Sequence, residues 1–178
     1  ETDIMNSVSS EQLEPEQQNY IDLFHQSVDN FPENIAIVDG PDQHSYRWLN
    51  AQANHLATLL EERFEVRPDD RVVIALPRGA SLVSCLLAVS KLSAVFVPLD
   101  PSHPEQRLAE IIEKVRCKLV LTSSDVERHL KPLISTATLN VDDASIFSPL
   151  PIGDITDSSD KKAPTPGAEN LAYIIFTS

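Results

Sequence analysis

Apolar residues follow two different spacings along this chain, and the two spacings predict a succession of helices and strands. Apolar positions that recur every three or four residues predict helices at residues 20–28, 46–64, 81–92, 104–115 and 126–134. Short continuous apolar runs predict strands at residues 34–38, 71–76, 94–97, 118–122, 139–141 and 171–176. Because strands and helices alternate, we expect an α/β fold of βαβ units, in which helices flank a parallel sheet.

Polar residues and prolines between these runs predict where the elements begin and end. Ser45, immediately before the helix at 46–64, is expected to be its N-cap. The Asp-Gly-Pro-Asp sequence at residues 39–42 predicts a turn, and Pro104 favours the start of a helix. Asp100 follows a strand and has prolines on both sides. We interpret its carboxylate as a turn-forming group in preference to a catalytic one.

Composition divides the chain into regions. Residues 1–14 are polar and acidic without an apolar period, and we expect a flexible linker there. Residues 15–178 carry the helix and strand pattern and are expected to form one domain or large subdomain around one core. Within it, residues 148–170 hold four prolines, two glycines and few apolar residues, which predicts a long loop of a functional or mobile kind.

Charge and cysteine content narrow the classes of partner and compartment. Acidic residues outnumber basic ones by 27 to 14, which gives a formal net charge of −13. This balance argues against nucleic acids and anionic membranes as partners, since both bind clustered Lys and Arg. No apolar run approaches the roughly 18 residues of a membrane span, and two unpatterned cysteines do not indicate a disulfide framework. We therefore expect a cytoplasmic protein.

Several reactive side chains are present, but their surroundings favour structural roles. The five histidines are too dispersed in the sequence for a metal site. Cys85, within an apolar helix, is interpreted as a buried small hydrophobe, and Cys117 has too few basic neighbours for a reactive thiol. Asp69 and Asp70 are interpreted as turn residues and not as a catalytic pair.

The last residues of the chain are its strongest candidates for chemistry. Residues 171–176 form a continuous apolar run with β-branched and aromatic members, which is typical of a strand buried on both faces. Thr177 and Ser178 follow directly, at the expected carboxyl end of that strand. Their hydroxyl groups would lie where open α/β sheets bind ligands. Taken alone, the same residues would also suit the polar end of a buried strand.

Four segments, in this order, resemble motifs of the adenylate-forming superfamily. Residues 45–57 resemble its Leu-Thr-Tyr-x-Glu-Leu-Asn-x-x-Ala-Asn-x-Leu-Ala segment, and residues 68–72 resemble its Pro-Gly-Asp-x-Val turn. Residues 91–101 are similar to Leu-Lys-Ala-Gly-Ala-Ala-Tyr-Val-Pro-Leu-Asp-Pro. Residues 171–178 resemble Leu-Ala-Tyr-Ile-Ile-Tyr-Thr-Ser, the strand that leads into the family's phosphate loop. One such motif is weak, whereas four in the family's order and spacing are specific.

Residues 101–108 look most like the amino-acid-activating branch of the superfamily, which is found in nonribosomal peptide synthetases. The resemblance implies that the chain is the N-terminal part of an adenylation domain, an incomplete portion of its large subdomain. Two residues depart from the motifs: Trp48 stands where Glu is usual, and Ser93 stands where Gly is usual. The Arg78-Gly79 junction could suit an anion, but in this family the junction is structural.

The resemblance also implies an activity for the complete domain. Such a domain condenses an amino acid or other carboxylic acid with Mg-ATP (ATP with Mg²⁺) to an acyl-adenylate. It then loads the acyl group on the phosphopantetheine thiol of a carrier-protein domain. Thr177 and Ser178 would contribute to binding the ATP phosphates, and no catalytic or metal-binding residue is assigned in this chain. Because the glycines and lysine of the phosphate loop are absent from the 178 residues, the chain alone is expected to be inactive.

Other interpretations share these features. The adenylation domain of a carboxylic acid reductase and a free-standing acyl-CoA ligase would carry the same motifs, although residues 98–104 favour the carrier-linked types. A non-catalytic scaffold or interaction fragment is a further alternative of a different class. The residues that select the acid in this family lie downstream, so the acid is not predicted.

Overall fold

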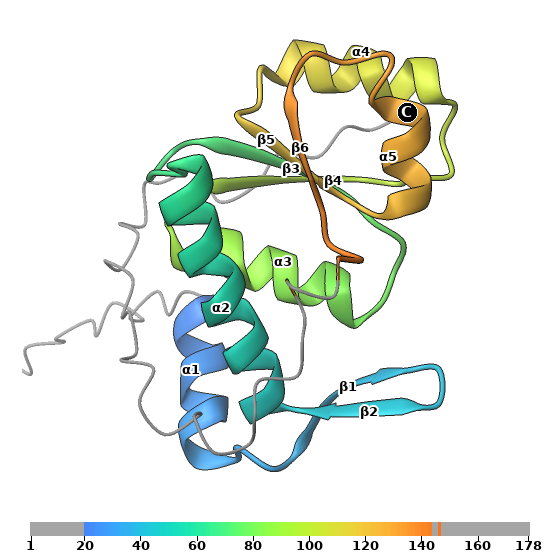
Figure 1. Cartoon of the computed structure of the whole chain (residues 1–178). Helices are drawn as coiled ribbons and strands as arrows, with labels where there is room; N and C mark the ends of the chain where they lie inside the picture. Colours follow the sequence, from blue (N-terminus) through green and yellow to red (C-terminus); the bar gives the residue numbers. More distant parts are fainter. Residues whose placement is uncertain (1–19, 144–145, 147–178) are drawn as a thin grey trace, which may run out of the picture.

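The computed structural model describes residues 20–143 and residue 146 (Figure 1). The predicted linker at 1–14, the loop at 148–170 and the strand at 171–176 lie outside these residues and stay predictions. The helices are α1 (Tyr20–Asn30), α2 (Tyr46–Phe64), α3 (Ala80–Lys91), α4 (Glu105–Val115) and α5 (Ser124–Leu130). The strands are β1 (Ile35–Asp39), β2 (Asp42–Ser45), β3 (Arg71–Ala75), β4 (Val95–Leu99), β5 (Leu119–Thr122) and β6 (Ala137–Asn140).

Four strands form a parallel sheet in the order β4-β3-β5-β6, which confirms the predicted fold class. β3 lies between two partners, pairing with β4 along its whole length and with β5 from Val72 to Ala75. β6 pairs with the other edge of β5. The chain runs from β3 through α3 to β4, and α4 then carries it back past β3 to β5. β4 therefore lies on one side of β3, and the later strands β5 and β6 lie on the other side.

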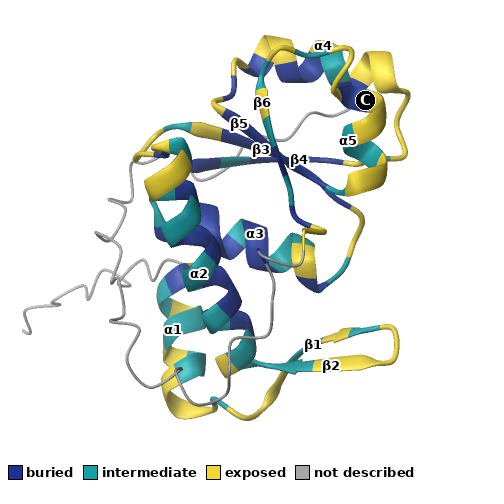
Figure 2. Cartoon of the chain, viewed as in Figure 1, coloured by how far each residue is buried: buried dark blue, intermediate teal, exposed yellow. Residues whose placement is uncertain are grey.

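Helices cover both faces of this sheet, as a parallel sheet requires. Val72 and Ile74 of β3 belong to a buried cluster with residues of α2 and α3. Val73 and Ala75, which alternate with them, belong to a second cluster with residues of α4 and α5. All four side chains are fully buried, and burial of an aliphatic side chain of valine or isoleucine size is worth about 1.5–3 kcal/mol. Figure 2 shows these strands as the buried centre of the sheet layer.

A smaller unit of α1 and the β1–β2 hairpin packs beside α2 and α3. Ile21 of α1, Leu49 and Ala53 of α2, and Leu87 of α3 share a third buried cluster. β1 and β2 form an antiparallel pair separate from the main sheet. The sequence analysis predicted the turn between them but not β2 itself, because Asp42–Ser45 (Asp-Gln-His-Ser) has no apolar alternation.

Several helix boundaries follow the predicted signals, but α5 begins at Ser124 and ends at Leu130, whereas the predicted helix ran from residue 126 to residue 134. Ser45 is the N-cap of α2, and its Oγ accepts a hydrogen bond of 3.2 Å from the amide of Trp48. Pro104 is the N-cap of α4, immediately before the first helical residue. The apolar stripe predicted for α4 is buried, and it consists of Leu108, Ile111, Ile112 and Val115.

Two turns use a backbone conformation that favours glycine. Asp69 and Ser93 have φ angles of 67° and 55°, in the left-handed region. The amide of Asp69 donates a hydrogen bond of 3.0 Å to the carbonyl of Ser93, so the two turns contact each other. Both positions are glycine in the adenylate-forming motifs that residues 68–72 and 91–101 resemble, so Asp69 departs from its motif in addition to Trp48 and Ser93. Because Asp tolerates this region better than most residues, the greater strain is expected at Ser93.

We predict that Ser93→Gly raises the free energy of unfolding by about 1 kcal/mol, because glycine has no Cβ atom to crowd the left-handed backbone. Ser81→Gly in α3 is the matched control. There the same substitution, at an exposed helical residue, should lower the free energy of unfolding by about 0.5–1 kcal/mol. Urea unfolding followed by circular dichroism measures both variants. Equal destabilisation by the two substitutions would show that Ser93 is not strained.

Candidate functional site

The residues assigned to phosphate binding, Thr177 and Ser178, lie outside the described residues, and their role stays a prediction. The described residues nevertheless include the surface where open α/β sheets bind ligands, which is the carboxyl edge of the parallel strands. Helices α3, α4 and α5 begin at this edge, after β3, β4 and β5. A helix start attracts anions through its free amide groups and its dipole. Each of these three helix starts is therefore a candidate site for phosphate binding.

The start of α3 already holds a carboxylate of the same chain. Asp39, the last residue of β1, accepts a hydrogen bond of 2.8 Å from the amide of Ala80. Gly79 permits this approach, since a Cβ atom there would lie 2.7 Å from Asp39 Oδ2. The contact joins the β1–β2 hairpin to α3 and stabilises the helix as an N-cap acceptor does. The Arg78-Gly79 junction therefore carries an internal anion, in agreement with the structural role expected from the resemblance.

A carboxylate of the same chain also binds the start of α5. Asp142, which follows β6, accepts a hydrogen bond of 2.7 Å from the amide of Ser124. The Oγ of Ser123 accepts one of 3.4 Å from the amide of Val126. Asn140 holds this arrangement in place: its side-chain nitrogen donates to Ser124 Oγ at 2.8 Å, and its Oδ1 accepts from the amide of Asp142 at 2.9 Å. The first turn of α5 is thus bound by polar groups of the chain itself.

Asp100 forms the turn between β4 and α4, as the sequence predicted. Its Oδ1 accepts a hydrogen bond of 2.9 Å from the amide of Ser102. Hydrogen bonds from the backbone and the side chain of Ser102 lower the pKa of the Asp100 carboxyl, and the charges of His103 and Arg78 lower it further. A carboxylate that stays ionised and bound to a turn amide is a poor proton donor. Asp100 therefore has the turn-forming contact that the sequence predicted.

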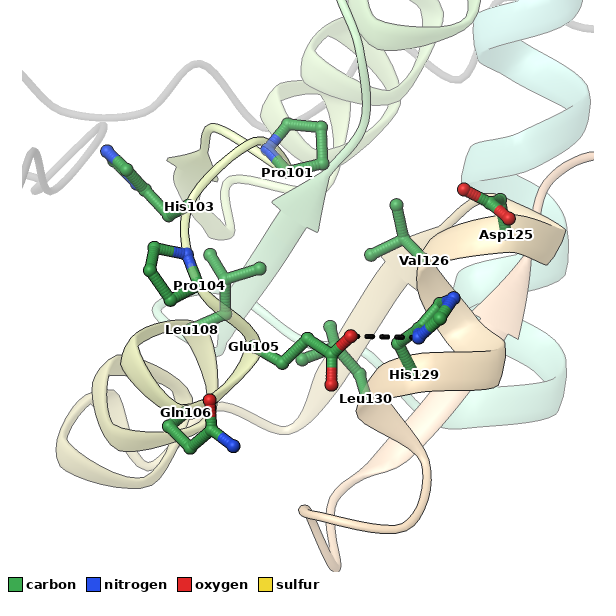
Figure 3. A pocket seen from close by; sticks show the side chains of 10 residues that line it. All are labelled: Pro101, His103, Pro104, Glu105, Gln106, Leu108, Asp125, Val126, His129 and Leu130. Atoms are coloured by element: carbon green, nitrogen blue, oxygen red, sulfur yellow. Dashed lines mark ion pairs between the residues drawn. The ribbon is translucent and has the colours of Figure 1, made fainter.

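A surface hollow of about 560 Å³ lies between the start of α4 and α5 (Figure 3). At its rim, Glu105 Oε1 lies 2.8 Å from His129 Nδ1, and both side chains are about half exposed. An exposed pair of this kind contributes little to stability. The side chains that line the hollow include no lysine, arginine, cysteine, serine or threonine. Apart from His103 and His129, they therefore offer no cation for phosphate, and they offer no hydroxyl or thiol nucleophile.

The other reactive side chains within the described residues have structural surroundings. Cys85 and Cys117 are buried, and burial raises the pKa of both thiols, which keeps them protonated and unreactive. Asp70 accepts hydrogen bonds from the amide of Arg67 at 2.8 Å and from Lys118 Nζ at 3.1 Å, as a turn residue does. Across residues 20–143 and 146, no three His, Cys, Asp or Glu side chains gather as a metal site.

Sequence reasoning missed the two aspartates that close the helix starts. Asp39 had been assigned only to a turn, and it lies 41 residues before its partner Ala80. Asp142 follows a short strand and lies 18 residues after its partner Ser124. Only the topology brings these groups together, so no local pattern would have found them. In the described residues, carboxylates of the chain itself bind the amides at two of the three helix starts on the carboxyl edge of the sheet, those of α3 and α5.

Comparisons with known proteins agree with this fold. The family model described as "AMP-binding enzyme" matches residues 24–178. Novobiocin biosynthesis protein H of Streptomyces niveus is 36% identical over 160 residues, which are 88% of this chain and 26% of that protein. Tyrocidine synthase 3 of Brevibacillus parabrevis is 33% identical over 156 residues, which are 88% of this chain and 2% of that synthase.

A solved structure extends the likeness to three dimensions. The nonribosomal peptide synthetase FmoA3, in its form bound to α-methyl-L-serine-AMP, aligns with a TM-score of 0.74 at 25% identity. The alignment covers 88% of this chain and 17% of that one. The chain thus spans about a quarter of the novobiocin protein and a smaller part of the two synthetases.

The contact between Asp39 and the start of α3 can be tested by a double-mutant cycle. We predict that Asp39→Ala and Gly79→Ala each lower the free energy of unfolding by about 1–2 kcal/mol, the first by removing the acceptor and the second by displacing it. In the Asp39→Ala background, Gly79→Ala should cost much less, because the carboxylate it displaces is gone. Asp39→Asn keeps an acceptor oxygen and is the control. Urea unfolding measures all the variants, and strictly additive costs would contradict the contact.

Proposed function

The chain belongs to the AMP-binding enzyme family, and we propose that it is the N-terminal part of an adenylation domain in a longer enzyme. The observation that carries the proposal is the family match over residues 24–178, which includes all four motif segments. The similar structure of FmoA3 favours the carrier-linked branch, because FmoA3 is a nonribosomal peptide synthetase by name. The longer enzyme is then a ligase of secondary metabolism, of the nonribosomal peptide synthetase type.

The proposed reaction has two steps. A carboxylate oxygen of an amino acid or other acid attacks the α-phosphorus of ATP, and the bond to the β-phosphate breaks, which gives an acyl-adenylate and pyrophosphate. The phosphopantetheine thiol of a carrier domain then attacks the acyl carbon, and AMP leaves. The carboxylate is already a competent nucleophile, so positioning and charge stabilisation supply most of the catalysis. The aminoacyl-AMP bound in FmoA3 supports the first step by analogy.

The described residues serve this reaction as a scaffold. Asp39 and Asp142 bind the amides at the starts of α3 and α5, and the hollow beside α4 has no lysine or arginine side chain. Carboxylates at these places disfavour a triphosphate, and the described residues form no cluster of three metal ligands, so we assign no step to Mg²⁺ there. We propose that the ATP phosphates are held by the hydroxyls of Thr177 and Ser178 together with a loop beyond them. On this basis the 178-residue chain alone does not catalyse adenylation.

The partners follow from the same proposal. The activated acid and ATP are the small-molecule ligands, and the carrier domain and the rest of the adenylation domain are the protein partners. We place the enzyme in the cytoplasm, where ATP and reduced thiols are available. Within the part of the chain that the structure covers, no helix has both the length and the hydrophobicity to cross a membrane.

We predict that Thr177→Ala and Ser178→Ala in the longer enzyme each lower the rate of ATP–pyrophosphate exchange by about 10- to 100-fold. Each substitution removes a hydrogen bond to a charged group, and such bonds are worth about 1.5–3 kcal/mol. Ser135→Ala, at an exposed position, is the control and should leave the rate unchanged. The assay uses a panel of amino and other carboxylic acids, which also identifies the substrate.

Three outcomes would contradict the proposal, the last of them only in part. Exchange by the 178-residue chain alone would show that the scaffold holds a complete site. No exchange by the longer enzyme with any acid of the panel would favour a non-catalytic homologue. Transfer of the acyl group to CoA in place of a carrier thiol would overturn the carrier-linked branch and leave adenylation intact.

A further inference from the structure

Helix α1 is held on α3 by polar contacts as well as by apolar packing. The hydroxyl group of Tyr20 forms a hydrogen bond with Ser90 Oγ, and His25 Nε2 lies 2.7 Å from Lys91 Nζ. Of the 11 residues of α1, all of which the structure describes, only Ile21 is buried. A helix of this length is marginal in water by itself. The position of α1 therefore depends on its contacts with neighbouring helices.

The contact between His25 and Lys91 sets a requirement on the protonation of the histidine. Lys91 ends α3 and is only 5% exposed, and it is the one buried charged residue within residues 20–143 and 146. An ammonium group has donors and no acceptor, so its hydrogen bond to His25 needs Nε2 as an acceptor. The imidazole must then be neutral, with its proton on Nδ1. Both side chains also take part in other interactions, but the ammonium fixes the role of Nε2 in this contact.

A second proton on His25 would remove this contact. Nε2 would become a donor, and two cations would face each other at a separation that now holds a hydrogen bond. The ring of Phe24, whose centroid lies 6.0 Å from Lys91 Nζ, would remain the aromatic neighbour of the ammonium. It cannot replace the lost acceptor, because an aromatic face does not hydrogen-bond as a ring nitrogen does. Protonation of His25 therefore disfavours the docked position of α1.

The other titratable groups of the described helices around His25 do not supply a second acceptor of the same kind. On α1, Asp22 and Asp29 stand three and four residues from His25, which is the spacing of neighbours on a helix. Their carboxylates moderate the charge of a protonated imidazole but leave its Nε2 a donor. Burial raises the pKa of Tyr20, so its hydroxyl group stays neutral in mildly acidic solution. From α2, the ring of Tyr46 packs on Phe24 at 6.1 Å and carries no charge there.

We infer that the contact between His25 and Lys91 makes the docking of α1 pH-dependent, so that α1 is held on α3 at neutral pH and released in mildly acidic solution. Released α1 carries a histidine with the ordinary pKa of about 6.5, whereas docked α1 disfavours the proton. Docking is therefore strongest above about pH 6.5 and weakens as the pH falls below it. By this linkage the ratio of released to docked α1 rises about tenfold from pH 7.5 to pH 5.5. This inference does not depend on the proposed function.

Hydrogen exchange in the longer enzyme tests the inference, with mass spectrometry of peptides from α1 at pH 7.5 and pH 5.5. After correction for the intrinsic pH dependence of amide exchange, we expect the α1 peptides to exchange about tenfold faster at pH 5.5. Peptides from α4, which has no contact with His25 or Lys91 among those described, should exchange equally at the two pH values. His25→Gln is the matched variant, because its side-chain oxygen accepts from the ammonium at either pH. In that variant the exchange of α1 should not change between the two pH values.

A second variant and three contrary outcomes complete the test. Lys91→Met keeps a long side chain and removes the cation, so the effect of pH on α1 should become much smaller. Equal corrected exchange of α1 at the two pH values in the unmodified enzyme would overturn the inference. A tenfold increase that persists in His25→Gln would also overturn it, because another group would then be responsible. Faster exchange of α4 together with α1 at pH 5.5 would do so as well, since it would report general acid unfolding and not the release of α1.

Discussion

The central constraint on this structure is that a parallel sheet must be covered on both of its faces. β3 shows the constraint most directly, because Val72 and Ile74 enter one buried cluster while Val73 and Ala75 enter the other. The strand order β4-β3-β5-β6 requires crossover helices, and these helices supply the cover. α2 and α3 bury one face, and α4 and α5 bury the other (Figure 1). The positions of the starts of α3, α4 and α5 follow from this layering.

The same layering brings helix starts to the carboxyl edge of the sheet, where many α/β proteins bind phosphate. In this protein, side chains of the same chain bind the amides at two of those helix starts. Asp39 reaches α3 from the hairpin and Asp142 reaches α5 from the end of β6. Each carboxylate satisfies amide groups that a phosphate would otherwise bind. Two of the three helix starts at this edge therefore connect elements of the chain, which supports our proposal that the described residues are a scaffold for a site formed elsewhere in the domain.

Most of the scaffold could be predicted from the sequence, because its signals are local. The apolar runs of β3 and β5 and the stripe of α4 are read directly from residue spacing. β2 could not be predicted, since Asp42–Ser45 pairs with β1 through its backbone and has no apolar period. The helix closures by Asp39 and Asp142 could not be predicted either, because they join residues far apart in the chain. The left-handed φ of Ser93 was visible only as a departure from the glycine of a family motif. Thr177 and Ser178, the predicted phosphate ligands, lie outside the described residues.

The most direct test of the scaffold role is an amide NMR titration of the 178-residue chain with Mg-ATP. The amide resonances of Ala80 and Ser124 report on the two closed helix starts. We predict that both keep their chemical shifts as the nucleotide is raised to millimolar concentration, because Asp39 and Asp142 already bind these amides. Saturable shifts of both resonances would show that the sheet edge binds phosphate itself and would contradict the scaffold role.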